Sequence, residues 1–166
     1  MTFAALTTGD AVFVDANTLI HLFQPHPQWG HSCLRLIQRI DNQDLIGFTS
    51  THVVSEVSHR LMTIEANHAL GWSIAGISNR LRANPHEVQK LSLFRRAVEQ
   101  IAQSRLQILT ITPSVLIAGA ALCQQLGLLT NDAITVALMQ AQGLSKIATS
   151  DADFDRVPGI TRFIPA

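Results

Sequence analysis

Residues 11–23, AVFVDANTLIHLF, join a short apolar run to the first turns of a helix. The run before Asp15 is rich in β-branched and aromatic side chains, which predicts a buried strand ending at that carboxylate. Asn17 is a favourable N-cap residue, so we expect a helix to begin there and to end before Pro25. The first predicted strand therefore ends with a carboxylate, Asp15, at its C-terminal end.

The alternation of apolar runs and helical patterns continues along the chain. Further strands are expected over 45–49, 105–111, 146–149 and 161–164, with helices over 29–40, 51–64, 85–104, 113–126 and 132–142. Ser50 or Thr51 is expected to cap the third helix, Gly127 to end the helix over 113–126, and Thr130-Asn131 to cap the helix over 132–142. Strands that alternate with helices form parallel sheets covered on both faces. We therefore expect an α/β fold with a central, mostly parallel sheet of four to five strands flanked by helices.

The composition indicates a compact cytoplasmic protein with no membrane association. The 166 residues are 47% hydrophobic and 14% charged, without repeats or blocks of like charge, which suits one globular domain. The first residues, MTFAALTTGD, lack the basic and apolar regions of a signal peptide. The longest apolar run, VLIAGAALC, is too short to cross a bilayer. Cys33 and Cys123 have no zinc-ligand spacing.

Six of the twelve acidic residues lie in four short motifs, VFVDANTLI, SEVSHRL, TNDAITVAL and TSDADFD. Asp15 and Asp151 follow predicted strands, Asp132 lies in the first turn of a helix, and Glu56 lies on a helix edge. Ligands bind at the carboxyl ends of parallel strands, so all four side chains are expected to converge there. Carboxylates that meet repel one another unless a hard cation joins them. The pattern indicates Mg²⁺ or Mn²⁺ and metal-dependent phosphodiester chemistry.

Each acid also has a simpler interpretation. Asp15 alone is a possible helix cap, Asp132 a first-turn acid stabilised by the helix dipole, and Glu56 a solvated helix residue. The combination of the four, with three acids crowded into TSDADFD, favours the metal site.

The four motifs together resemble a PIN domain, and most closely the VapC-like toxins of bacterial and archaeal toxin–antitoxin pairs. The resemblance covers nearly the whole chain in the right order, and it implies a PIN-like three-layer sandwich. It assigns catalysis and metal binding to Asp15, Glu56, Asp132 and Asp151, with Asp153 as a neighbouring metal ligand. It also assigns Asn17, Thr149 and Ser150 as polar groups that orient ligands or water.

The same resemblance implies an activity and partners. Such a protein is an endoribonuclease that uses Mg²⁺ or Mn²⁺ to activate the water that hydrolyses RNA phosphodiester bonds. It is the toxin of a type II toxin–antitoxin pair, forms a homodimer, and is silenced by a small antitoxin protein.

Two features depart from the compact family pattern. The long stretch between Glu56 and Asp132 predicts an extra helical segment around 66–104 within a single PIN-like domain over 1–166. The net charge is zero, although residues 80–105 carry six basic and two acidic residues, a net of +4. These basic residues either contact RNA phosphates or form a solvated helix face.

Two rival functions remain open. An apolar strand followed by Asp-x-Asn-Thr is similar to the nucleophile loop of haloacid dehalogenase-like phosphatases, in which Asp15 would form an aspartyl-phosphate. That family needs a second Asp where Asn17 stands. A non-catalytic binding module with the PIN fold is the other alternative. The chain contains no G-x-S-x-G, P-loop or dinucleotide-binding glycine pattern.

Overall fold

The computed structural model describes residues 1–166 and contains one sheet of five strands, in the order β3-β2-β1-β4-β5. The strands are β1 (Ala11–Val14), β2 (Ile46–Ser50), β3 (Gln107–Leu109), β4 (Lys146–Ala148) and β5 (Thr161–Phe163). All four strand pairs are parallel. The predicted α/β fold is thereby confirmed, with five strands and with no antiparallel pair in the sheet.

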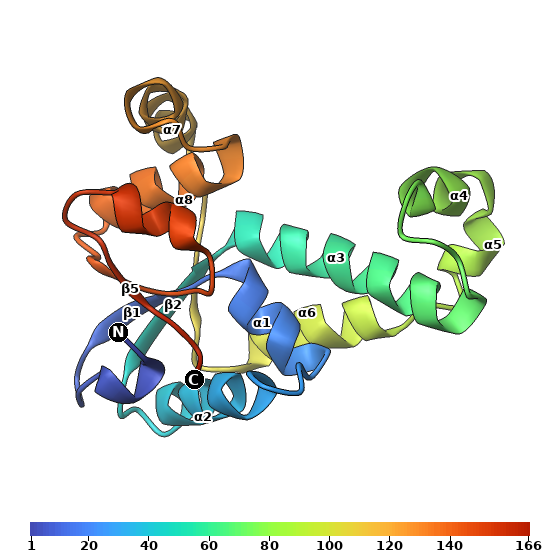
Figure 1. Ribbon diagram of the computed structural model, residues 1–166, viewed down its shortest axis with the longest axis horizontal. Coiled ribbons are helices and arrows are strands. Elements are labelled where there is room, and N and C mark those ends of the chain that lie inside the picture. Colours follow the sequence, from blue (N-terminus) through green and yellow to red (C-terminus); the bar gives the residue numbers. More distant parts are fainter.

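Eight α-helices flank the sheet. They are α1 (Ala16–Phe23), α2 (Gly30–Asp41), α3 (Thr51–Leu70), α4 (Ile77–Ala83), α5 (Pro85–Val88), α6 (Leu93–Gln103), α7 (Pro113–Leu126) and α8 (Thr130–Ala141). The 3-10 helices η1 (Phe3–Ala5) and η2 (Ala152–Arg156) complete the set. In Figure 1, α2 lies on one side of the sheet and α7 and α8 lie on the other. This arrangement gives the three layers expected from the sequence.

The order of the strands creates a crevice beside β1. The chain moves outward from β1 to β2 and β3, and then crosses back to β4 on the other side of β1. Right-handed crossovers therefore leave from opposite faces of the sheet at the boundary between β1 and β4. The carboxyl ends of two strands open into a crevice at such a switch point. Asp15 follows β1 and Thr149 follows β4, so both lie at this boundary.

Helix α8 fixes one wall of that crevice. Seven consecutive residues, 133–139, are buried, because the helix packs between the sheet and α7. Asp132 comes directly before this buried run, in the first turn of the helix. The burial of the following residues holds the Asp132 backbone in place.

Residues 66–104 form most of a helical arm that extends from the sheet. The second half of α3 runs outward, α4 and α5 form the tip, and α6 returns beside α3 (Figure 1). The arm has its own apolar cluster of Ala66, Ile77, Leu81 and Leu91, separate from the main core. The main core contains 32 buried residues around the sheet, so the arm is stabilised by a second, smaller set of contacts.

The prediction of one helix over 85–104 is wrong. Helix α5 ends at Val88 and α6 begins at Leu93. The Glu65 carboxylate on α3 accepts hydrogen bonds from Ser92 N, at 3.0 Å, and from Leu93 N, at 2.8 Å. It satisfies N–H groups that a continuous helix would bond internally, and so it stabilises a new helix start.

Two of the predicted helix caps are also wrong. The N-cap positions are Asp15 for α1 and Leu129 for α8, so Asn17 and Asn131 lie inside the first turns of their helices. The predicted caps elsewhere are confirmed. Ser50 Oγ accepts from Val53 N at 3.1 Å, and Gly127 ends α7 with φ of 65°.

No single helix has the length and apolarity needed to cross a membrane. Only α7 and α8 taken together reach that length and composition, and the pair is bent by 115° at its break.

Candidate metal centre

A cavity of about 250 Å³ opens at the carboxyl ends of β1 and β4. It is lined by Asp15, Ala16, Asn17, Ile20, Glu56, Arg60, Asn131, Asp132, Thr135 and Asp151. All four acids singled out in the sequence are among these residues. They come from four separate segments, the end of β1, α3, the start of α8 and the end of β4, so the fold alone brings them together.

Asp15 is held in one orientation by two polar side chains. Its Oδ2 atom accepts hydrogen bonds from Thr149 Oγ1 at 2.8 Å and from Asn17 Nδ2 at 2.9 Å. Its backbone N–H donates to Ala148 O, across the β1–β4 boundary. Oδ2 is thus satisfied, and Oδ1 makes no hydrogen bond to another side chain. That second oxygen is free to contact a ligand in the cavity.

Thr149 connects the two strand ends through a single hydroxyl. Its Oγ1 donates to Asp15 and accepts from Asn17 Nδ2 at 2.7 Å and from Asp151 N at 3.1 Å. A hydroxyl has one donor and two acceptor positions, so all three are used. Asn17 Oδ1 also accepts from Ser150 N at 3.1 Å. The three polar residues suggested by the resemblance therefore form one network around Asp15.

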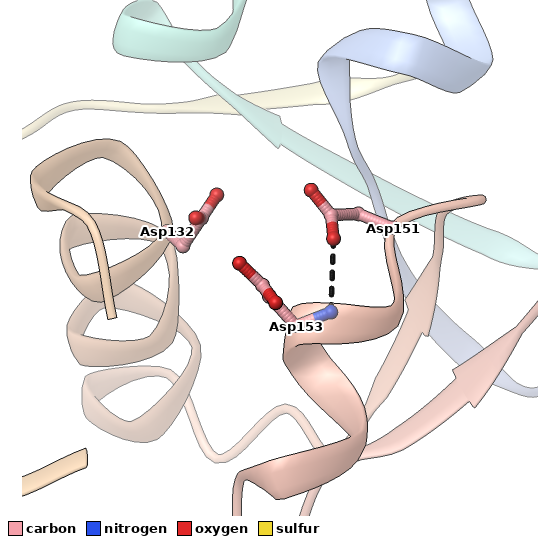
Figure 2. Close-up of side chains that lie close together, drawn as sticks. All are labelled: Asp132, Asp151 and Asp153. Atoms are coloured by element: carbon pink, nitrogen blue, oxygen red, sulfur yellow. Dashed lines mark hydrogen bonds between the residues drawn. The ribbon is translucent and has the colours of Figure 1, made fainter. Parts of the chain in front are cut away.

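Asp132, Asp151 and Asp153 form a tight group, with carboxylate oxygens within 4.8 Å of one another. Figure 2 shows Asp132 projecting from α8 toward the other two, which belong to the turn at the start of η2. Asp151 Oδ1 accepts from Asp153 N at 2.9 Å, which fixes the turn. Three carboxylates at this separation strongly favour a cation between them.

The charges in the cavity alter the acidity of two of its residues. Burial raises the pKa of Asp15 to about 6, and the nearby charges of Glu56 and Asp132 act in the same direction, against the hydrogen bond from Thr149. Burial also raises the pKa of Asp132 to about 6, with further contributions from the negative charges of Asp151 and Asp153. Both carboxylates are therefore less stable as anions here than in water.

Arginines next to the group neutralise the acids at its edge. Arg156 forms an ion pair with Asp153. Arg162 binds both oxygens of Asp155, at 2.8 and 2.6 Å, and lowers the pKa of that carboxyl. Asp155 is thus engaged outside the cavity, although it belongs to the same TSDADFD motif. Asp153 contacts both Asp151 and Arg156, at the border between the acidic group and its basic surround.

Glu56 projects from α3 and is held from the opposite wall. Its Oε2 atom accepts from Asn131 Nδ2 at 3.2 Å, a contact between residues 75 positions apart. Asn131 was expected to cap α8, and its side chain orients Glu56 instead. Arg60 and Thr135 also line the cavity and were missed by the sequence analysis. The signal for Arg60 was its position four residues after Glu56, on the same face of a helix.

The residues present fit a hard divalent cation. The cavity offers carboxylate, amide and hydroxyl oxygens, and neither histidine nor cysteine lines it. Mg²⁺ and Mn²⁺ prefer such oxygen ligands, whereas zinc sites use sulfur and imidazole. Asp132, Asp151 and Asp153 are the nearest candidates for one ion, and Asp15 and Glu56 face the same space.

Comparisons with known proteins agree with this geometry. A family model described as the PIN domain matches residues 12–160. No curated protein matches the sequence.

Several solved toxin structures share the fold. A VapBC2 complex from Rickettsia felis, bound to a DNA fragment from its promoter, has a TM-score of 0.57 and 15% identity over 94% of this chain and 99% of that chain. VapC20 from Mycobacterium tuberculosis, described as a Sarcin-Ricin loop cleaving toxin, has a TM-score of 0.59 and 16% identity over 87% and 92% of the two chains. A toxin–antitoxin complex from Klebsiella pneumoniae has a TM-score of 0.54 and 21% identity over 90% and 95%.

Proposed function

Because the chain belongs to the PIN domain family, we propose that it is a metal-dependent endoribonuclease and the toxin of a type II toxin–antitoxin pair. The observation that carries this proposal is the meeting of Asp15, Glu56, Asp132 and Asp151 in one cavity at the β1–β4 switch point. Four acids from distant parts of the sequence have no structural need to share a partly buried cavity, and their mutual repulsion costs stability. A catalytic metal site gives them a common role.

The residues divide the work of such a site between them. Asp132 and Asp151, with Asp153 beside them, would hold an Mg²⁺ or Mn²⁺ ion, and Asp15 would contribute its free Oδ1. When bound, such an ion lowers the pKa of the water that acts as nucleophile, and it neutralises negative charge on the phosphate. Asn17, Thr149 and Ser150 keep the Asp15 carboxylate in one rotamer, and ligand-orienting groups of this kind commonly affect metal affinity 10- to 100-fold.

Glu56 is the candidate general base. Its Oε2 atom is engaged by Asn131, whereas Oε1 makes no hydrogen bond to the protein. Oε1 can accept a proton from an attacking water, because a carboxylate held in place serves as a base when it lies within hydrogen-bond reach.

RNA as substrate and an antitoxin as partner are supported by analogy. VapC20 is described as cleaving the Sarcin-Ricin loop, and the Rickettsia and Klebsiella structures are toxin–antitoxin assemblies. The shared fold is the reason for proposing the same class of substrate and partner for this chain. The family match over 12–160 supports a single PIN-like domain, with the arm of α4 to α6 as part of it. The cytoplasm, where RNA and an antitoxin would be available, is the proposed site of action.

A homodimer is also part of the proposal. Helix α7 exposes Leu116 at 48% and Ile117 at 73%, and Leu129 just before α8 is exposed at 74%. Large apolar side chains that are exposed in the free chain are candidates for an interface between subunits. Sedimentation equilibrium of the wild type and of Ile117→Glu tests this part separately from the chemistry.

The decisive experiment is incubation of the purified protein with a mixed RNA pool and Mn²⁺, with and without a chelator. We expect cleavage by the wild type, loss of cleavage with chelator, and loss of at least about 100-fold in Asp15→Asn. Glu99→Gln, an acid-to-amide change on the exposed face of α6, is the matched control and should cleave normally. Cleavage that persists in Asp15→Asn would refute the site. Release of phosphate from para-nitrophenyl phosphate without RNA cleavage would indicate the phosphatase alternative.

A further inference from the structure

Arg60 is the one basic residue that lines the acidic cavity. It lies on α3 four residues after Glu56, which places the two side chains on one face of the helix, about 6 Å apart along its axis. The side chain is exposed to solvent at the mouth of the cavity. A cation at this position is available to whatever enters the cavity.

The position of Arg60 would ordinarily produce an ion pair with Glu56. An acid four residues before a basic residue is the favourable orientation for a helical ion pair. The pair does not form here, because Asn131 holds Glu56 Oε2 on the opposite side of the cavity at 3.2 Å. The side chain that would neutralise Arg60 is therefore kept elsewhere by a specific hydrogen bond from α8.

No other carboxylate replaces Glu56 as a partner of Arg60. Seven ion pairs occur in the protein, and none includes Arg60. Two arginines near the acidic group are paired, Arg156 with Asp153 and Arg162 with Asp155. On the arm, Lys90 and Arg95 are paired with Glu87 and Glu99. Arg60 is thus a guanidinium that lines a cavity with four carboxylates and forms an ion pair with none of them.

We propose that Arg60 binds a backbone phosphate of the RNA next to the phosphate that is cleaved. The inference rests on the proposed nuclease function and deepens it, since it assigns a positioning residue for the substrate. The acids and their cation would hold the scissile phosphate, and Arg60 lies on the same cavity wall, one helical turn from Glu56 on α3. A guanidinium presents a planar fork of donors that matches phosphate oxygens, and it keeps its charge at all physiological pH values.

This assignment also addresses the neutral charge of the chain. A polyanion that approaches four carboxylates is repelled unless cations lie along its path. Arg60 provides such a charge at the cavity mouth, whereas the basic residues of 80–105 lie on the arm or at its base, outside the cavity lining. Contact between those residues and RNA stays a separate prediction.

The test compares Arg60→Ala and Arg60→Lys with Arg35→Ala, a matched control that removes an exposed arginine of α2 lying outside the acidic cavity. Cleavage of a mixed single-stranded RNA pool is followed with Mn²⁺. Binding of the fluorescein-labelled pool is followed in the Asp15→Asn background, as a function of salt. For Arg60→Ala we expect KM to rise about tenfold or more with a smaller change in kcat, and the cleavage pattern to stay the same.

Three further outcomes decide the matter. The slope of log affinity against log salt should become less steep by about 0.7 for the loss of one phosphate contact to single-stranded RNA. Arg60→Lys should restore part of the loss as a point charge without the fork. All variants should melt at the wild-type temperature. Wild-type cleavage with unchanged KM and salt slope in Arg60→Ala would overturn the role of Arg60 alone. Absence of RNA cleavage and binding by the wild type would overturn the nuclease proposal and this inference together.

Discussion

Asn131 and Glu56, on different helices and 75 positions apart, are joined by one hydrogen bond of 3.2 Å across the cavity. This bond does two things. It directs a carboxylate toward Asp132 despite their like charges, and it keeps the same carboxylate from pairing with Arg60. The free energy of one amide–carboxylate bond thus determines whether the cavity holds a free acid and a free guanidinium, or a helical ion pair.

Replacement of Asn131 by alanine should allow Glu56 and Arg60 to pair. We expect RNA cleavage to fall about 10- to 100-fold, the range seen when a ligand-orienting group is removed. The free energy of unfolding should change by less than about 1 kcal/mol, because the lost bond is offset by a helical pair. Activity assays together with urea denaturation check both values. Asn79→Ala on the arm, which removes only an exposed contact to Arg82, is the control. Wild-type cleavage by Asn131→Ala would show that Glu56 needs no such support.

Glu65 stabilises the arm through the start of α6. Its carboxylate accepts from Ser92 N and Leu93 N, where no local side chain caps the helix. Glu65→Ala should lower the free energy of unfolding by about 1–2 kcal/mol, as for the loss of an N-cap. Glu99→Ala breaks only an exposed ion pair on the same helix and should cost less than about 1 kcal/mol. Denaturation curves of both variants measure the difference, and equal costs would contradict the capping role.

The sequence allowed three of the four acids to be placed because each of the three follows a local rule. Asp15 comes directly after one apolar run and Asp151 three residues after another, and the carboxyl ends of neighbouring parallel strands share one edge. Asp132 begins a helix that returns to the same edge. These positions depend only on strand and helix order, which the apolar pattern predicts well.

The side chains that orient the acids could not be placed in this way. Asn17 and Asn131 both look like helix caps locally, yet each donates to an acid that the fold brings near. The break between α5 and α6 contains no glycine or proline that would reveal it in the sequence. The new helix start is instead stabilised by Glu65 on α3, 27 positions before Ser92. For Arg60 the local rule predicts a pair with Glu56, whereas Glu56 accepts a hydrogen bond from the distant Asn131 instead. Local propensity fails where a distant polar group competes.

The acidity of Asp15 gives a pH dependence with a defined sign. Its pKa is raised from 3.8 to about 6 in the folded protein, so the unfolded state releases this proton first as pH rises. Without metal, the folded state therefore loses stability between about pH 4 and 6. Asp15→Asn removes this penalty and can keep the hydrogen bonds from Thr149 and Asn17. We expect the variant with chelator to melt at least about 2 °C above the wild type at pH 7.5, since each pKa unit corresponds to about 1.4 kcal/mol. The difference should vanish near pH 4.

A control with the opposite sign is available in the same motif. The pKa of Asp155 is lowered by the hydrogen bonds that it accepts from Arg162, so Asp155→Asn should lower the melting temperature at neutral pH and lose that effect in acid.

Added Mn²⁺ should raise the melting temperature of the wild type and leave that of Asp15→Asn less affected. If Asp15→Asn melted below the wild type at pH 7.5 with chelator, the ionised Asp15 carboxylate would not destabilise the folded protein, and the argument from its raised pKa would be wrong.

The hydroxyl of Thr149 is the centre of the network around Asp15, and the residue is fully buried. Thr149→Val keeps the shape but removes the donor to Asp15 and the acceptor for Asn17 Nδ2 and Asp151 N. Two donors lose a buried partner, so the free energy of unfolding should fall by about 1–3 kcal/mol. Mn²⁺ affinity, measured by calorimetric titration, should fall about 10- to 100-fold because Asp15 is no longer held in one rotamer. Thr149→Ser retains the hydroxyl and should bind Mn²⁺ nearly as the wild type does, at a stability cost of about 1 kcal/mol for the lost methyl group. If the valine and serine variants bound the ion equally well, orientation of Asp15 would play no part in metal binding, and the hydroxyl would serve only the fold.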